Sequence, residues 1–166
     1  VGPEMIIVDT HTHAGLNWFE PVDMLVHQMN LNGVEKAVLI QHGRPQTGGY
    51  DHTYLFECVE RFPGRFAVVV IVDVTEPDAL EKLDAYAARG ATGIRLNPDQ
   101  RSPGDDPLAI WRRADDLGLV VSSMGGVDLT GSDEFSNLVA TFPDLPIVIE
   151  HLAGGGEGAG FPRNGE

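Results

Sequence analysis

The 166-residue sequence contains a single cysteine, few basic residues and no long apolar run. Because one thiol cannot form a disulfide within the chain, we expect a reducing, cytoplasmic setting. No stretch reaches the roughly 18 apolar residues that a membrane-spanning helix needs. Only 11 Lys and Arg stand against 25 Asp and Glu, a net charge of −14. A nucleic-acid partner would require a basic surface, so that class is disfavoured, and we interpret the acidity as a source of solubility.

Short apolar runs alternate with amphipathic stretches along the whole chain. Most runs are continuous and rich in β-branched residues, which is typical of parallel strands buried on both faces. Between the runs, apolar residues recur at helical spacing, as from Val22 to Met29. Cys58 lies on such a stripe and is expected to be a small core residue, while His27 and His52 are interpreted as surface or packing residues. We therefore predict five helices between six strands, near 5–8, 37–40, 66–72, 92–96, 119–121 and 147–149.

This alternation predicts an α/β fold with a parallel sheet, either an open doubly wound sheet or a closed (β/α)8 TIM barrel. The predicted strands recur every 26–31 residues. A closed barrel needs eight such units and typically about 250 residues. We therefore interpret residues 1–166 as one incomplete TIM-barrel domain, truncated at its C-terminal end, with about six of the eight strands. The glycine-rich stretch 154–160 is expected to be a loop after the sixth strand.

The strongest functional signal is a His-x-His pair, His11 and His13, at the end of the first predicted strand. Residues i and i+2 of an extended chain point the same way, so both imidazoles should project to one side. In a parallel barrel, active sites lie at the C-terminal ends of the strands. Two neutral imidazoles near one point form part of a site for Zn²⁺ or a similar metal. We predict that both histidines bind metal; the alternative is ordinary hydrogen bonding at a strand end.

Other candidate residues follow later strands at the same face. His151 ends the sixth strand and is predicted to bind metal or to act on the substrate as a catalytic residue. Four residues are predicted to bind substrate: Arg95, Asn97, His42 and Asp73. A guanidinium can hold a carboxylate through two parallel hydrogen bonds, which suits Arg95; the alternative is an ion pair within the barrel.

Three blocks of sequence resemble the amidohydrolase-related branch (amidohydrolase family 2) of the amidohydrolase superfamily. They are DTHTH at residues 9–13, GIRLNP at 93–98 and FPDLPIVIEHL at 142–152, and FPGRF at 62–66 also fits. The resemblance implies a metal-dependent TIM-barrel hydrolase, with relatives that act as decarboxylases, hydratases or lactonases. It implies that His11 and His13 are metal ligands and that His151 is the histidine of the sixth strand.

The sequence departs from the family pattern in three places. Family members usually carry a histidine at the end of the fifth strand, where this chain reads VSSMG at residues 121–125. The fourth strand is not followed by a lysine that could form a carbamylated bridge between two metals. The aspartate that relatives carry at the end of the eighth strand, as general acid or base, is expected beyond residue 166.

The sequence thus predicts a hydrolase that uses a divalent metal, Zn²⁺ or alternatively Mn²⁺. We expect it to cleave a C–N or C–O bond in an amide, lactone or ester of a small, carboxylate-bearing substrate. One alternative is a decarboxylase or lactonase on the same scaffold without a tightly bound metal. Another is a non-catalytic, open α/β binding domain. We expect a small molecule as the partner and no membrane; a homo-oligomer is compatible with the sequence.

Overall fold

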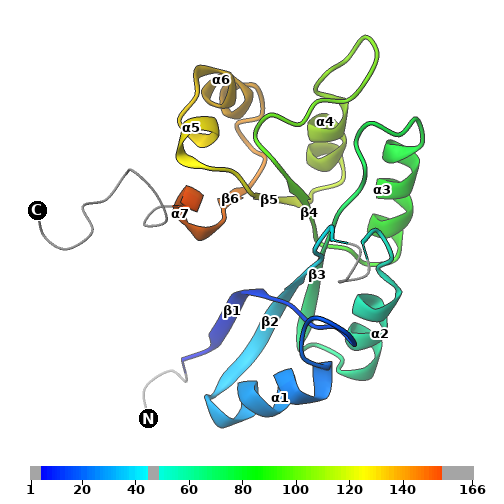
Figure 1. Ribbon diagram of the computed structural model, residues 1–166, viewed down its shortest axis with the longest axis vertical. Coiled ribbons are helices and arrows are strands. Elements are labelled where there is room, and N and C mark those ends of the chain that lie inside the picture. The colour runs from blue at the N-terminus through cyan, green and yellow to red at the C-terminus, as the bar shows by residue number, and fades with distance from the viewer. Residues whose placement is uncertain (1–4, 45–48, 155–166) are drawn as a thin grey trace, which may run out of the picture.

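The computed structural model describes residues 5–44 and 49–154 and contains one parallel sheet of six strands (Figure 1). The strands are β1 (Ile7–Thr12), β2 (Val34–Ile40), β3 (Phe66–Val70), β4 (Gly93–Leu96), β5 (Val120–Ser123) and β6 (Ile147–Ile149). The helices are α1 (Val22–Leu31), α2 (Thr53–Arg61), α3 (Ala79–Ala88), α4 (Ala109–Asp116), α5 (Val127–Thr130), α6 (Asp133–Thr141) and α7 (His151–Gly154).

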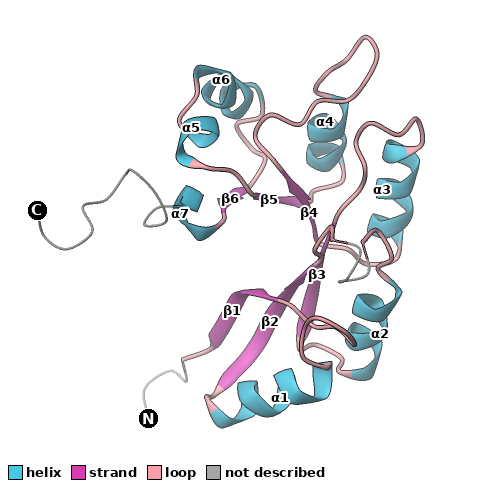
Figure 2. Cartoon of the chain, viewed as in Figure 1, coloured by secondary structure: helices cyan, strands magenta, loops and turns pink. Residues whose placement is uncertain are grey.

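The strands lie in the order in which they occur along the chain, from β1 to β6, and all neighbours pair in parallel. A doubly wound sheet would require a point at which the strand order reverses, so that alternative is wrong. Figure 2 shows the helices α1 to α4 and α6 along the outer side of the curved sheet. This arrangement confirms the predicted partial TIM barrel with six strands.

The main core lies between the sheet and the outer helices. Strand residues such as Leu39, Val70 and Ile94 are fully buried there, as is Trp111 of α4. Cys58 is also fully buried, which confirms its prediction as a core residue. Burial of this apolar area against the outer helices stabilises the central parallel strands.

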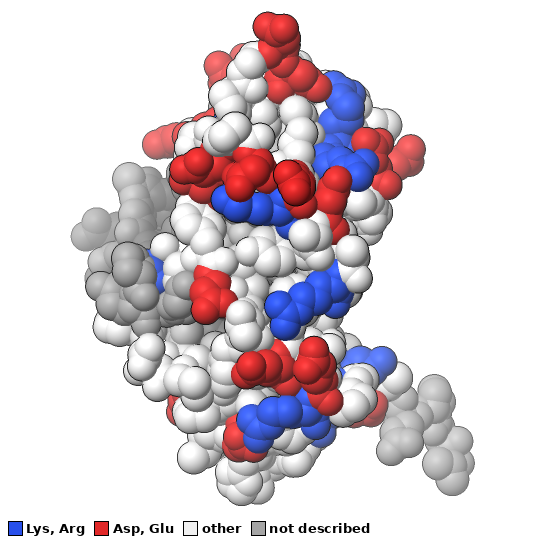
Figure 3. All heavy atoms as spheres, turned by 90° about the vertical axis from the view of Figure 1, so that its right-hand side faces the viewer, with Lys and Arg blue, Asp and Glu red and all other residues white. Residues whose placement is uncertain are grey.

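The outer helical face carries charges of both signs (Figure 3). Exposed ion pairs join Arg61 to Asp23 and Lys82 to Asp78. Such exposed pairs contribute little to stability, but they intersperse the two signs across the face. Among the described residues, this face therefore presents no continuous basic patch of the kind that binds nucleic acid.

Several elements differ from the sequence prediction; β2 begins at Val34 rather than 37, and β3 ends at Val70 rather than 72. The first strand spans Ile7–Thr12 rather than 5–8, because the polar residues that follow the apolar run pair with β2 as far as Leu39. The short helix α5 precedes the predicted fifth helix, which is α6. The loop expected at 154–160 lies, apart from Gly154, outside the described residues. Within the described ranges, no helix combines the length and apolar character needed to cross a membrane.

His52, which the sequence indicated as either a surface or a packing residue, packs inside the protein. Its side chain is buried, its Nε2 accepts a hydrogen bond from the backbone N–H of Ile71 at 3.0 Å, and its ring lies 4.4 Å from that of Tyr86. Burial lowers the pKa of His52 to about 4. The neutral imidazole therefore supports the chain just beyond β3, at the end of the sheet where the predicted site residues lie.

We expect His52 to make the protein less stable in mild acid. The unfolded state, with a histidine pKa of about 6.5, binds this proton more readily than the folded state. The stabilising contribution is therefore complete above pH 6.5 and is lost as the pH falls towards 4, by roughly 2–3 kcal/mol. Urea titrations of His52→Gln across this range should show a shallower loss of unfolding free energy than the parent. His27→Gln, at an exposed position of α1, is the control; equal slopes for all three proteins would contradict the prediction.

Candidate active site

His11 and His13 converge at the C-terminal end of β1. Their Nε2 atoms lie 3.3 Å apart, and their rings meet edge to face with centroids 5.0 Å apart. The pairing of β1 with β2 shifts register between Asp9 and Thr12, so β1 holds one extra residue there. Within this irregular part of β1, the Asp9 carboxylate accepts a hydrogen bond from the His11 backbone N–H at 3.0 Å. Irregularities of this kind redirect side chains at strand ends.

The orientation of His13 is fixed by the neighbouring strand. Its Nδ1 lies 2.7 Å from the backbone oxygen of Ile40, at the end of β2. A carbonyl oxygen only accepts hydrogen bonds, so Nδ1 carries the proton and Nε2 carries the lone pair. The ring also stacks on Phe19, with centroids 4.4 Å apart. His13 therefore presents a lone pair towards His11, as a metal ligand or hydrogen-bond acceptor would.

Glu150, directly after β6, forms the buried centre of the site. Its two carboxylate oxygens accept three hydrogen bonds of 2.5–3.1 Å from the Arg95 guanidinium of β4. The Ser122 hydroxyl of β5 donates another at 2.5 Å. The same carboxylate lies 4.0 Å from Nδ1 of His11. Glu150 thus connects the ends of β4, β5 and β6 with the histidine pair on β1.

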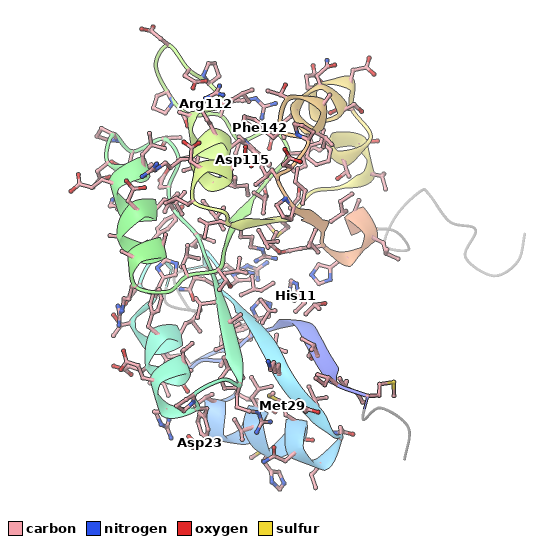
Figure 4. The ribbon with its side chains drawn as sticks, turned by 180° about the vertical axis from the view of Figure 1, so that it is seen from behind. His11, Asp23, Met29, Arg112, Asp115 and Phe142 are labelled. Atoms are coloured by element: carbon pink, nitrogen blue, oxygen red, sulfur yellow. The ribbon has the colours of Figure 1, made fainter. Side chains whose placement is uncertain are left out.

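His151 follows Glu150 and lies beside His11, with ring centroids 4.5 Å apart. Figure 4 shows His11 between β1 and α7, the short turn that begins at His151. His151, Leu152 and Ala153 all have positive φ angles of 50–56°. For residues with a side chain this left-handed conformation costs roughly 1–2 kcal/mol each, so the turn that carries His151 is strained.

Electrostatics favour neutral histidines and an ionised Glu150. Burial lowers the pKa of His11, although the nearby Glu150 opposes the shift. Burial also lowers the pKa of His13, against the effect of its hydrogen bond to Ile40. For Glu150, burial alone would raise the pKa, but the hydrogen bonds from Arg95 and Ser122 outweigh it and hold the pKa below its usual value. Neutral imidazoles are the form that binds metal ions.

The donor set fits a divalent metal. Two nitrogens bound to one tetrahedral zinc at about 2.0–2.1 Å lie about 3.3 Å apart, which matches the separation of the two Nε2 atoms. Ligand atoms of His11, Glu150 and His151 also lie within 4.8 Å of one another. Glu150 already accepts hydrogen bonds from Arg95 and Ser122. We therefore infer that the imidazoles are the better metal ligands and that Glu150 is an anion beside them.

The sequence of the chain matches the amidohydrolase family profile over residues 8–164. The chain belongs to the amidohydrolase family. No curated protein sequence matched it.

Solved structures similar to this chain share its fold. A probable 2-pyrone-4,6-dicarboxylic acid hydrolase from Acinetobacter baumannii, with citric acid bound, matches with a TM-score of 0.66 and 18% identity, over 90% of this chain and 59% of its own. A Pseudomonas putida protein, provisionally named as a hydrolase of the same acid, matches with a TM-score of 0.63 and 23% identity. The match covers 88% of this chain and 57% of the Pseudomonas protein. An uncharacterised TIM-barrel protein from Bordetella bronchiseptica matches with a TM-score of 0.67 and 16% identity, over 86% and 66%. The chain therefore spans about three fifths of the length of these structures.

The structure brings some of the predicted substrate-binding residues to the site. Arg95 lies within β4, and Asn97 directly follows that strand. His42 follows β2, and its ring lies 6.0 Å from that of His13. Asp73 instead accepts hydrogen bonds from the backbone and hydroxyl of Thr75 in the β3–α3 loop. For Arg95 the structure contains the ion pair that was the alternative to substrate binding. Substrate contact by these four residues stays a prediction.

Sequence reasoning missed Glu150 and Ser122 as members of the site. Glu150 stands in the EH dipeptide of the third matching block, and Ser122 stands in the segment that lacks the family's usual histidine. The available signal was an acidic residue at the end of a buried strand, which needs a cationic or hydrogen-bonding partner. Nothing local indicated that its partner is Arg95, 55 positions earlier.

Breaking the ion pair between Arg95 and Glu150 should destabilise the protein strongly. Their side chains are 8% and 1% exposed, so Arg95→Met or Glu150→Gln leaves one buried charge without its partner, at a cost of about 3–5 kcal/mol. The double variant should lose much less than the sum of the single losses, as measured by chemical denaturation. Additive losses would show that the two side chains are not coupled.

Proposed function

We propose that the protein is a metal-assisted hydrolase that cleaves a C–O or C–N bond in a small, carboxylate-bearing lactone, ester or amide. The observation that carries the proposal is the convergence of His11 and His13, with Nε2 atoms 3.3 Å apart at the strand end where barrel enzymes hold their active sites. Membership of the amidohydrolase family supports the same reaction class.

In this proposal His11 and His13 hold the metal. His151 is either a third metal ligand or a hydrogen-bond donor to the substrate carbonyl. A bound Zn²⁺ or Mn²⁺ supplies Lewis acidity and an acidified water. Hydrolysis adds the hydroxyl of water to the acyl carbon and a proton to the departing oxygen or nitrogen. The hydrogen bond to Ile40 keeps the lone pair of His13 on Nε2. Glu150 lies on the Nδ1 side of His11 and favours a proton there, which leaves its Nε2 available as well.

Lactones are the first substrates to test. Two of the similar structures carry names that describe them as hydrolases of 2-pyrone-4,6-dicarboxylic acid, a cyclic ester with two carboxyl groups.

A second candidate is a lactonase or decarboxylase that works without a tightly bound metal. The absence of a histidine at the end of β5, where Ser122 and Ser123 stand, favours it. In that case the histidines act on the substrate carbonyl directly through hydrogen bonds. Product analysis separates the reactions, because decarboxylation releases carbon dioxide whereas hydrolysis of a lactone opens its ring.

Removal of metal should abolish hydrolysis in an assay of lactones, esters and amides that begins with 2-pyrone-4,6-dicarboxylate. We expect chelator-treated protein to lose activity and Zn²⁺ or Mn²⁺ to restore it. His11→Ala and His13→Ala should lower kcat/KM by about 100-fold or more and reduce the metal content, because a metal supplies several kcal/mol of transition-state stabilisation.

His27→Ala, which alters an exposed histidine of α1, is the control and should keep both metal and activity. Full turnover after verified metal removal would reject the metal role and favour the second candidate. A lack of hydrolysis across the whole panel would reject the proposed function.

A further inference from the structure

Phe19 lies against one face of the His13 imidazole. The two rings are nearly parallel, with an angle of 14° between their planes, and their centroids lie 4.4 Å apart. Phe19 belongs to the loop between β1 and α1 and is half-buried. The other two large apolar side chains of this loop, Leu16 and Trp18, are 71% and 66% exposed. Phe19 is therefore the aromatic residue that the loop turns towards the histidine pair.

The loop holds Phe19 in place through contacts at both of its ends. The Gly15 N–H donates a hydrogen bond to the backbone oxygen of Glu20 at 3.0 Å, which closes the loop around Phe19. A Cβ atom on Gly15 would lie 3.4 Å from Cβ of Phe19, so the loop backbone packs directly on this side chain. Val22, the first residue of α1, is fully buried, and its N–H donates to the Tyr54 hydroxyl of α2 at 2.9 Å. The phenyl ring is thus anchored independently of His13.

The hydrogen bond between His13 and Ile40 does not by itself fix the plane of the imidazole. The torsion about the Cβ–Cγ bond of a histidine is broad, so a ring bonded only at Nδ1 can still tilt. Tilting would move Nε2 of His13 from its place 3.3 Å from Nε2 of His11. A flat ring packed parallel to the imidazole opposes this tilt, and aromatic pairs attract each other beyond the area they bury. The hydrogen bond therefore sets which nitrogen carries the proton, and the stack sets the plane of the ring.

The stack also suits a histidine that binds a cation. An imidazole that shares its lone pair with a cation gains positive character, and the face of a benzene ring attracts positive charge. A leucine in place of Phe19 would fill similar space but would lack both the flat face and this attraction. The phenyl ring should therefore stabilise His13 more in its metal-bound form than in its free form.

We propose that Phe19 is the positioning residue of His13, because its ring, stacked on the imidazole, holds Nε2 of His13 towards that of His11. The proposal deepens the proposed function and rests on it where a metal is concerned, since His13 is a metal ligand there. The orientation of the imidazole itself needs no metal, so it is measured separately.

The test compares Phe19→Leu with Phe19→Tyr, which keeps a flat ring. Zinc affinity, measured by competition with a coloured chelator, should fall about 2- to 10-fold in Phe19→Leu, the range expected for loss of an aromatic pair. Phe19→Tyr should bind zinc like the parent. In the metal-free proteins, NMR should show that the Nδ1 proton of His13 exchanges with water faster in Phe19→Leu than in the parent or Phe19→Tyr. The reason is that a tilting ring breaks its hydrogen bond to Ile40 more often.

Trp18→Leu is the matched control, because it removes an exposed aromatic ring from the same loop; it should leave zinc affinity and proton exchange unchanged. Circular dichroism checks that each variant is folded, and Phe19→Met replaces Phe19→Leu if the latter is not. Equal losses in Trp18→Leu, or no rescue by Phe19→Tyr, would overturn the positioning role. If Phe19→Leu matches the parent in zinc binding and proton exchange, the proposed function stands and the positioning role fails. If the parent binds no zinc but Phe19→Leu still speeds the exchange, the metal role fails and the positioning role stands.

Discussion

The geometry of the site depends on the buried ion pair between Arg95 and Glu150. It fixes the end of β4 to the residue after β6, and Ser122 adds β5 to the same carboxylate. Burying two charges costs several kcal/mol per ion, so such a pair adds little net stability compared with apolar residues of similar size. We infer that its main contribution is positional, because it holds a carboxylate 4.0 Å from His11 and places His151 next in the chain.

Charge is distributed differently at the site than over the molecule. The outer helices mix acidic and basic side chains in exposed pairs. At the carboxyl ends of the strands, burial keeps the histidines neutral while Glu150 stays ionised against Arg95. Neutral imidazoles and an ion pair that is balanced within the protein therefore lie side by side.

The fold was predictable because its signals are local and repeated. Continuous β-branched runs and helical apolar spacing predicted six parallel strands and the partial barrel, and the i, i+2 rule predicted that His11 and His13 would share a side. The irregular register near Asp9 was not predictable, since polar residues joined β1 without an apolar pattern. The role of Glu150 depends on Arg95, 55 positions away, and a contact of that length leaves no periodic trace in one sequence. For the same reason the sequence left two roles of Arg95 open, substrate binding and an ion pair within the barrel.

We propose that the Nε2 atoms of His11 and His13 bind one metal ion while Nδ1 of His13 stays protonated. Nitrogen-15 NMR of the histidine side chains during a zinc titration tests it directly. The account predicts that Nε2 of both residues shifts together and saturates at one equivalent of zinc, with the Nδ1 proton of His13 retained throughout. Zinc-independent spectra, or a His13 ring protonated on Nε2 instead of Nδ1, would contradict it.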